Sequence, residues 1–346
     1  MPSNTAIVYL KHPTEFPVPG EHLGVRTNKD FNPVLKDGEV LTRNLVISLD
    51  PYMRGRMRDA SIQSYAPAFQ IGRPLDARGV AEVIESKNSK YPVGSIIHAF
   101  VGWEEYTVLP DLPTTMIIPQ ARELQSSLPL SSYVGVLGMP GLTAYSSLKD
   151  IGQPKAGETI FISAASGAVG QLAGQLAKAW GLTVIGSVGS DDKVDYLLKE
   201  VGFHHAFNYK KRSVHEALKE LAPKGIDIYF ENVGGETLEA ALDNMNTFGR
   251  VIACGMISQY NTREPYGIKN LMEVVVKRLT IRGFIVGDFH DKYFADFFRD
   301  VKDLLLKKEI VYRVDEAKGI EAAPEAFVGM LRGKNFGKQV VKIADI

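Results

Sequence analysis

The pattern of hydrophobic and polar positions changes after about the first 125 residues, and the change predicts two kinds of structure. In the first part, short β-prone segments such as 39–48 and 78–84 are separated by turn signals rich in Gly, Pro and Asp, for example Lys36-Asp37-Gly38. This part of the chain therefore predicts an all-β barrel or sandwich-like domain.

From about residue 130 onward, short apolar runs alternate with helical patterns of about 10 to 15 residues, which is typical of βαβ units around a parallel sheet. We expect strands at residues 159–163, 183–187, 205–209, 226–231, 250–254 and 279–286. We expect helices at residues 169–180, 192–201, 214–221 and 237–245. Six strands match the doubly wound order of a Rossmann nucleotide-binding domain.

The C-terminal tail ends in a short β-prone run at residues 337–343, which can rejoin the β-rich domain. That domain would then be discontinuous in sequence. We therefore expect a β-rich domain of residues 1–130, completed by residues 310–346, and an α/β Rossmann domain of residues 131–309.

The composition is that of an ordinary globular protein, with 45% hydrophobic and 23% charged residues. Forty Lys and Arg residues balance forty Asp and Glu residues, which removes the main electrostatic argument for a nucleic acid or an acidic membrane as partner. No apolar run approaches the about 18 residues of a membrane span, and the N-terminus lacks a signal-peptide pattern. The single cysteine, Cys254, favours a reducing compartment, so we expect a cytosolic protein.

A glycine-containing turn, residues 164–170, joins the first predicted strand of the α/β part to the helix that follows it. Such a turn presents free backbone N–H groups and the positive helix end to an anion, and Gly167 and Gly170 allow the phosphates to approach the backbone. Ala165 stands where the first glycine of G-x-G-x-x-G is expected, which weakens the motif. The alternative to dinucleotide binding is a tight turn whose glycines serve only the packing of helix on strand. The α/β pattern that follows favours dinucleotide binding.

The end of the second predicted strand, residues 186–190, is small and uncharged, whereas NAD-selective sites usually place an acidic residue there. Lys193 and the Tyr209 hydroxyl can bind a 2′-phosphate, so the sequence favours NADP(H). Two alternatives remain: Asp191 or Asp192 binds an NAD ribose, or these residues only cap and solvate a helix start.

Further motifs follow a specific order and spacing over nearly the whole chain. They lie at residues 49–54, 138–145, 164–170, 189–193, 207–209, 231–235, 254–261 and 333–338. In these motifs the chain resembles the zinc-independent medium-chain dehydrogenase/reductases, specifically the leukotriene 12-hydroxydehydrogenase, prostaglandin reductase and plant double-bond reductase family.

The resemblance implies a chaperonin-10-like catalytic domain into which the Rossmann domain is inserted. It also implies reduction of the C=C bond of α,β-unsaturated ketones and aldehydes with NADPH, and in some members oxidation of an allylic alcohol. The cofactor contacts that it implies fall on Gly167, Ala168, Val169, Gly170, Lys193, Tyr209, Asn232, Cys254, Gly255, Ser258, Tyr260, Phe284, Ile285, Val286 and Asn335.

Zinc-dependent relatives carry a catalytic cysteine near the second barrel strand and a Gly-His-Glu motif soon after it, and this chain has neither. Tetrahedral zinc needs three or four suitable ligands, and adjacent His204 and His205 would face opposite ways on a strand. We expect no metal site. Zinc-free members often form homodimers through the last strand of the nucleotide domain, and residues 278–286 are β-prone enough to do so. The alternative is an edge strand covered within one chain.

A conjugated enone accepts hydride at its β-carbon, and the charge that develops on the carbonyl oxygen needs a hydrogen-bond donor. Tyr260, after the fifth predicted strand, is the candidate donor, directly or through the nicotinamide ribose. Alternatively, Tyr260 only contacts the cofactor and solvent protonates the α-carbon. Tyr52 takes the place of the zinc-ligand loop, where it lines the substrate pocket or binds the carbonyl; its alternative is packing on the barrel.

Other polar residues in these motifs receive structural interpretations. Asp50 before Pro51 is interpreted as a turn former, and Arg54 and Arg56 as solvated surface residues, with binding of a substrate carboxylate as the alternative. Cys254 is interpreted as a small core or cofactor-lining residue rather than a reactive thiol.

The sequence thus favours an NADPH-dependent enone and enal reductase. The alternatives are a quinone reductase that uses the same cofactor turn, and a non-catalytic NADPH-binding or sensing protein, because a fold does not dictate function. Loops 57–69 and 260–269 shape the substrate pocket, and their conformations do not follow from sequence, so the natural substrate is not predicted.

Overall fold

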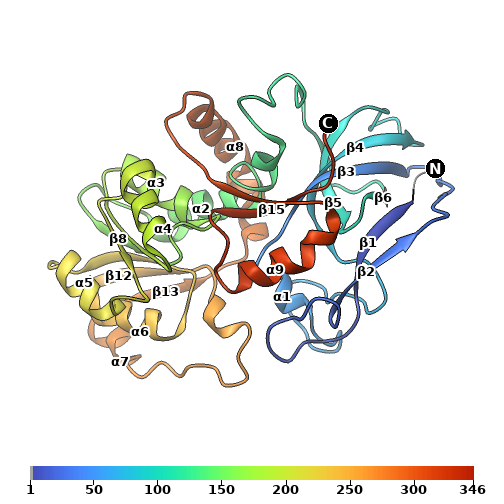
Figure 1. Ribbon diagram of the computed structural model, residues 1–346. Helices are drawn as coiled ribbons and strands as arrows, with labels where there is room; N and C mark the ends of the chain where they lie inside the picture. Colours follow the sequence, from blue (N-terminus) through green and yellow to red (C-terminus); the bar gives the residue numbers. More distant parts are fainter. Residues whose placement is uncertain (1–2) are drawn as a thin grey trace. The chain divides into compact units, whose positions relative to one another are not determined.

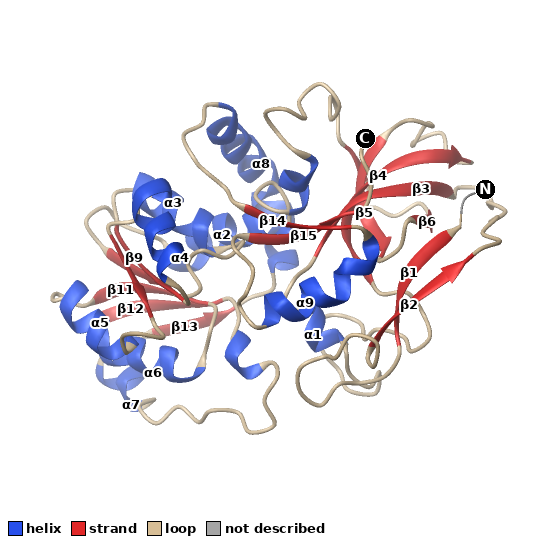
Figure 2. Ribbon diagram, in the orientation of Figure 1, coloured by secondary structure: helices blue, strands red, loops and turns tan. Residues whose placement is uncertain are grey.

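The computed structural model describes residues 3–346, which divide into two compact units (Figures 1 and 2). The first, called the β-rich unit, contains the chain up to Gly135 together with Val314–Ile346. The second, called the Rossmann unit, contains Val136–Arg313. The chain therefore leaves the first unit, forms the second as an insertion, and returns.

A six-stranded parallel sheet forms the centre of the Rossmann unit, in the order β10-β9-β8-β11-β12-β13. The strands are β8 (Thr159–Ile162), β9 (Thr183–Val188), β10 (His205–Asn208), β11 (Ile226–Glu231), β12 (Met245–Ala253) and β13 (Thr280–Gly283). This is the 3-2-1-4-5-6 order of the doubly wound fold, which confirms the predicted fold class.

The four predicted helices connect consecutive strands: α3 (Gly170–Ala179), α4 (Asp191–Tyr196), α5 (Val214–Leu221) and α6 (Gly235–Asn244). Three further helices were not predicted: α2 (Met139–Ser147) precedes β8, α7 (Met272–Val276) lies between β12 and β13, and α8 (His290–Leu306) follows β13. The start of α5 has a local cause, because the Ser213 hydroxyl accepts a hydrogen bond from the Glu216 N–H at 3.3 Å. Strands β8, β9 and β11 are buried on both faces, which explains why they read as nearly continuous apolar runs.

Some predicted boundaries in this unit are wrong. The last strand ends at Gly283 rather than at residue 286, and Val286–Phe289 form a 3-10 turn in which Phe289 stacks on Phe284. The predicted helix 192–201 is α4 followed by a wider π-helical turn, Leu197–Val201, which ends where Gly202 adopts a φ of 78°. The left-handed conformation stops the helix, because Gly adopts it without strain.

A seven-stranded sheet forms most of the β-rich unit, in the order β14-β15-β3-β4-β5-β7, with β6 also paired to β3. Its strands are β3 (Val40–Ser48), β4 (Asp76–Ser86), β5 (Ile96–Gly102), β6 (Tyr106–Leu109), β7 (Met116–Ile117), β14 (Val314–Lys318) and β15 (Lys338–Lys342). A separate hairpin pairs β1 (Asn4–Tyr9) with β2 (Leu23–Asn28). The helices of the unit are α1 (Met53–Arg56) and α9 (Ala323–Leu331).

The C-terminal tail is part of the β-rich unit. Strand β15 pairs antiparallel with β3, with Val340 opposite Ser48. Behind this sheet, Trp103 and Phe327 meet edge to face, with ring centroids 5.6 Å apart, in the buried core. Residues more than 200 positions apart in sequence therefore form one core.

No helix within residues 3–346 combines the length and the apolar character that a bilayer crossing needs.

Candidate cofactor site and active site

The glycine turn adopts a conformation that leaves room for an alanine at its leading position. Between β8 and α3, Ala164 has a φ of 48°, and its carbonyl accepts a hydrogen bond from the Gly167 N–H at 3.0 Å. The next residue, Ala165, is fully buried, and its N–H donates to the Ser187 carbonyl of β9 at 3.0 Å. The left-handed conformation falls on Ala164 and not on Ala165, so the position of the first motif glycine does not require a glycine for its backbone conformation.

The start of α3 packs tightly on this turn. A Cβ at Gly170 would lie 2.7 Å from the Ala164 carbonyl oxygen and from the Ala165 Cα, and these are backbone atoms that cannot rotate away. The Ala168 carbonyl accepts a hydrogen bond from the Tyr312 hydroxyl at 3.0 Å, which fixes the residue before Val169. The turn thus presents its N–H groups and the N-terminus of a ten-residue helix at the carboxyl edge of the sheet.

The predicted 2′-phosphate residues lie together at the end of β9. Lys193 is in the first turn of α4 and is 8% exposed. Tyr209 follows β10, and its N–H donates to the Val188 carbonyl at 3.0 Å. Its hydroxyl oxygen is 3.1 Å from the position that a Cβ at Gly189 would occupy, so the hydroxyl also lies at this strand end.

The two acidic residues nearby are engaged within the protein. Asp191 accepts a hydrogen bond from Asn208 at 2.8 Å and pairs with Lys211, and these contacts lower the pKa of its carboxyl. A hydrogen bond from Ser190 lowers the pKa of Asp192. Lys211 was not predicted to take part, although it belongs to a basic run, residues 210–212, directly after Tyr209.

A buried carboxylate supports the next strand end. Glu231 closes β11, is fully buried, and its Oε1 accepts hydrogen bonds from the N–H groups of Val233 at 2.5 Å and Gly234 at 2.8 Å. Asn232 uses both its backbone N–H, at 2.9 Å, and its side-chain amide, at 2.8 Å, to bond Ser163 after β8. Burial raises the pKa of Glu231. The hydrogen bonds that Glu231 accepts were not predicted either, although an acidic residue at the end of an apolar strand indicates such a role.

Tyr260 lies beyond β12, after the 3-10 turn Ile257–Gln259. Its hydroxyl oxygen accepts a hydrogen bond from the Met256 N–H at 3.3 Å, and within residues 3–346 the hydroxyl donates to no acceptor. Burial raises the pKa of Tyr260, so the phenol stays protonated at neutral pH. The hydroxyl proton is therefore available to a bound molecule.

The neighbouring residues line the same strand end. Cys254 and Gly255 donate backbone hydrogen bonds to the Glu231 carbonyl, at 3.0 Å and 3.1 Å. Burial raises the pKa of the Cys254 thiol to about 12, which keeps it uncharged. Ser258 is exposed, and its hydroxyl donates to the Val233 carbonyl at 2.5 Å. The uncharged thiol agrees with a lining role for Cys254.

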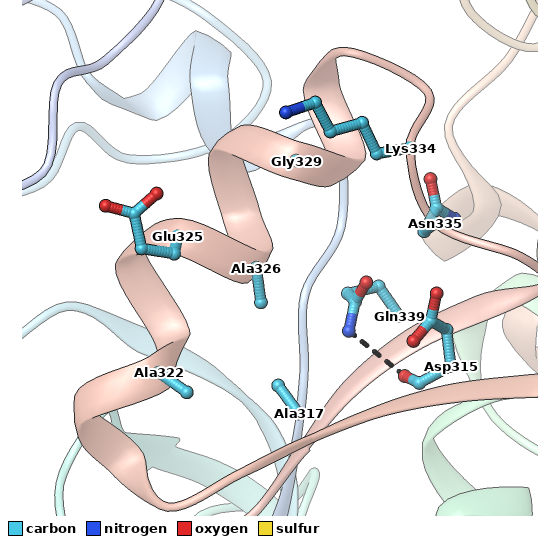
Figure 3. A pocket seen from close by; sticks show the side chains of 9 residues that line it. All are labelled: Asp315, Ala317, Ala322, Glu325, Ala326, Gly329, Lys334, Asn335 and Gln339. Carbon is cyan, nitrogen blue, oxygen red and sulfur yellow. Dashed lines mark hydrogen bonds between the residues drawn. The ribbon is translucent and has the colours of Figure 1, made fainter.

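The other predicted cofactor residues lie on two separate segments. Phe284, Ile285 and Val286 follow β13 at the carboxyl edge of the same sheet. Asn335 belongs to the β-rich unit, where it lines an open pocket between α9 and strands β14 and β15 (Figure 3). Its side-chain amide donates to the Gly337 carbonyl at 2.7 Å.

The segment around Tyr52 corrects three interpretations. Asp50 is 3% exposed, and it pairs with Lys338 at 3.1 Å and accepts a hydrogen bond from Ser48 at 2.5 Å, so it is a buried ion-pair residue rather than only a turn former. Arg54 and Arg56 are 8% and 6% exposed and are not solvated surface residues. Their burial was missed because the partners are distant in sequence.

Both arginines are held by the protein itself. Arg54 donates to the carbonyls of Pro13 at 3.1 Å and Glu15 at 2.8 Å. Arg56 forms a bidentate pair with Asp76 at 2.5 Å and 2.8 Å. Tyr52 directly precedes α1, and burial together with the Asp50 charge raises the pKa of its phenol.

Within residues 3–346, no three His, Cys, Asp or Glu side chains lie close enough together to hold a metal ion.

Comparisons with known proteins agree with this architecture. Residues 6–117 match a family described as the N-terminal domain of oxidoreductase, and residues 168–303 match one described as zinc-binding dehydrogenase. A zinc-type alcohol dehydrogenase-like protein of Schizosaccharomyces pombe is 50% identical over 100% of both chains. The NADP(+)-dependent 2-alkenal reductase of Nicotiana tabacum is 46% identical over 88% of this chain and 88% of its own.

A solved structure, CurA of Vibrio vulnificus in complex with NADPH, matches with a TM-score of 0.91 and 36% identity, and covers 99% of this chain and 100% of its own. The chain thus belongs to the medium-chain dehydrogenase/reductases, in the zinc-independent family that includes prostaglandin and alkenal double-bond reductases.

Proposed function

We propose that this protein reduces the C=C bond of α,β-unsaturated ketones and aldehydes with NADPH. The observation that supports this most directly is the Tyr260 hydroxyl, which lies at the carboxyl edge of the nucleotide-type sheet with its proton unused by the chain. The tobacco relative is named a 2-alkenal reductase, and the related CurA structure contains NADPH. The protein is accordingly an NADP-dependent oxidoreductase.

The cofactor assignment uses the strand ends described above. The turn from Gly167 to Gly170 binds the pyrophosphate, and a side chain at Gly170 would already collide with the turn. Lys193 and Tyr209 are assigned to the 2′-phosphate. The nearby Asp191 already has two protein partners, which argues against the alternative that it binds an NAD ribose. Asn232, Cys254, Gly255, Ser258, Phe284–Val286 and Asn335 complete the proposed contacts.

When bound, NADPH supplies the hydride that adds to the β-carbon of the substrate. Tyr260 donates a hydrogen bond to the carbonyl oxygen as enolate charge develops, directly or through the nicotinamide ribose. Its raised pKa keeps the proton on the phenol until that point. Tyr52 lines the substrate pocket, and the buried Asp50 beneath it holds the segment in place.

A homodimer formed through β13 is also proposed, in the reducing cytosol that the single cysteine favours. Strand β13 is at the sheet edge and all four of its residues are exposed. Helix α7, just before it, exposes Met272 and Val275, each to 69%. An unpaired edge strand beside apolar side chains is a ready surface for pairing with a second copy.

Substrate choice tests the activity. NADPH oxidation measured with a simple enal, a simple enone and a quinone is expected to give the higher kcat/KM with the enal and enone. A large preference for the quinone would instead assign the protein to quinone reduction. Failure to oxidise NADPH with every compound in a varied panel would favour a binding or sensing role.

The 2′-phosphate assignment is tested by Lys193→Ala. The KM for NADPH is expected to rise by about 10- to 100-fold, because a charge-assisted hydrogen bond is lost, while the KM for NADH changes little. Lys199→Ala is the matched control, since Lys199 is 71% exposed and paired with Asp195. Equal effects on the two cofactors, with an unchanged melting temperature, would refute the role.

The proton-donor assignment is tested by Tyr260→Phe. This change is expected to lower kcat by about 100-fold or more while the Kd for NADPH, measured by fluorescence titration, stays within about threefold. Tyr266→Phe serves as control, because the Tyr266 hydroxyl is already bonded to Glu239 at 3.1 Å. An unchanged kcat with a weaker NADPH affinity would leave Tyr260 as a cofactor contact only.

The dimer is tested by sedimentation. The protein is expected to sediment as a dimer, and Ile281→Glu, which places a charge on the exposed β13, is expected to shift it to the monomer. A monomeric wild-type protein at micromolar concentration would contradict the proposal.

A further inference from the structure

The Glu231 carboxyl uses its two oxygens unequally. Oε1 accepts hydrogen bonds from the Tyr229 hydroxyl at 2.8 Å and from the N–H groups of Val233 at 2.5 Å and Gly234 at 2.8 Å. Oε2 is buried and bonds no donor of residues 3–346. Burying a carboxyl costs free energy unless hydrogen bonds compensate it. Here the compensation comes through one oxygen, and the turn that directly follows β11 supplies two of the donors.

This turn, residues 232–235, packs closely against the segment that precedes Tyr260. The Val233 carbonyl accepts hydrogen bonds from the Ser258 N–H at 3.0 Å and from the Ser258 hydroxyl at 2.5 Å. Gly234 has a φ of 74°, and a Cβ there would lie 2.8 Å from the Cβ of Met256. A shift of the turn therefore displaces residues 256–258 as well.

Tyr260 is held by the same segment. Its N–H donates to the Ile257 carbonyl at 3.3 Å, and its hydroxyl oxygen accepts a hydrogen bond from the Met256 N–H at 3.3 Å. The main chain and the end of the side chain both depend on residues 256 and 257. The Glu231 carboxyl is thus connected to the Tyr260 hydroxyl in two steps, through the turn after β11 and through the segment bonded to that turn.

Asn232 has an anchor of its own. Its backbone N–H and its side-chain amide both bond Ser163, and its carbonyl accepts a hydrogen bond from the Ile257 N–H at 3.1 Å. None of these bonds uses the Glu231 carboxyl. Loss of that carboxyl therefore loosens the Tyr260 segment without releasing Asn232, which is a proposed cofactor contact.

We infer that Glu231 is a positioning residue for catalysis, which fixes the Tyr260 hydroxyl through the turn after β11. This inference rests on the proposed function, because it assigns the Tyr260 hydroxyl to the reacting carbonyl oxygen. A donor at this oxygen acts only when it is held in place before charge develops. Removing the carboxyl therefore affects the chemical step more than cofactor binding.

The kinetic test uses Glu231→Leu, which keeps the approximate size of the side chain and removes both oxygens. With a simple 2-alkenal, kcat is expected to fall by about 10- to 100-fold, since a misplacement of about 1 Å can cost about 100-fold. The Kd for NADPH, measured by fluorescence titration, is expected to stay within about threefold, because Asn232 keeps its anchor. Glu231→Gln retains an acceptor oxygen for the turn and is expected to keep kcat within about threefold of the wild type. Should Glu231→Leu fail to fold, Glu231→Asp is the second variant, because its shorter side chain moves the acceptor away from the turn and the same loss of kcat is expected.

A double-mutant cycle shows whether the loss passes through Tyr260. Glu231→Leu combined with Tyr260→Phe is expected to be at most about threefold slower than Tyr260→Phe alone, because coupled residues are not additive. Glu158→Leu is the matched control, since Glu158 is also a largely buried carboxylate, paired with Arg250 at 2.7 Å directly before β8. This control is expected to keep kcat within about threefold. Where Tyr260→Phe lowers kcat, an additive loss in the double mutant, or an unchanged kcat in Glu231→Leu, would overturn the inference.

Hydrogen exchange separates this inference from the proposed function, because it needs no substrate. The Ile257 and Ser258 N–H groups are expected to exchange at least about tenfold faster in Glu231→Leu than in the wild type or in Glu158→Leu. If Tyr260→Phe leaves kcat unchanged while this faster exchange is observed, the proton-donor assignment fails and the positioning by Glu231 stands. Unchanged exchange at both N–H groups would overturn the inference.

Discussion

The β-rich unit depends on one buried ion pair. Lys338 and Asp50 are 288 positions apart, and the three ammonium protons of Lys338 are met by the Asp50 carboxylate and by the carbonyls of Leu49 and Gln339. Removing one partner of such a pair typically costs about 3–5 kcal/mol, because the other charge stays buried. The pair joins β15 to the end of β3, directly before the Tyr52 segment. The last strand therefore also supports a candidate substrate-binding residue.

In the Rossmann unit, too, contacts between segments distant in sequence hold the residues at the carboxyl edge of the sheet in place. Each functional strand end is held by a partner from another strand: Ala165 by Ser187, Asn232 by Ser163, and Cys254 by the Glu231 carbonyl. These supports use hydrogen-bonding groups that would otherwise be buried without partners. The Ala165 and Gly167 N–H groups of the turn are used by the protein, whereas the N-terminus of α3 and the Tyr260 hydroxyl proton face no acceptor of the chain among the described residues.

Side-chain pairing also decides which charges can act on a substrate. Arg54 and Arg56, near Tyr52, are both bonded within the protein, Arg54 to the carbonyls of Pro13 and Glu15 and Arg56 to the Asp76 carboxylate. Their donors are therefore used by the fold.

Local patterns were sufficient to locate the Rossmann strands, α5 and the glycine turn, because each depends on neighbours within a few residues. The strand order followed from matching six such strands to the doubly wound fold. The same patterns misjudged Asp50, Arg54 and Arg56 and did not reveal that the Glu231 carboxyl is buried. Burial and pairing of a charge depend on contacts such as Lys338 with Asp50 and Asp76 with Arg56, which span many intervening residues. The sequence alone therefore determined the fold class, the family and the glycine turn between the first strand and helix of the Rossmann unit, while tertiary packing decided which charged groups are buried and paired, since electrostatic partners are selected by distance in space.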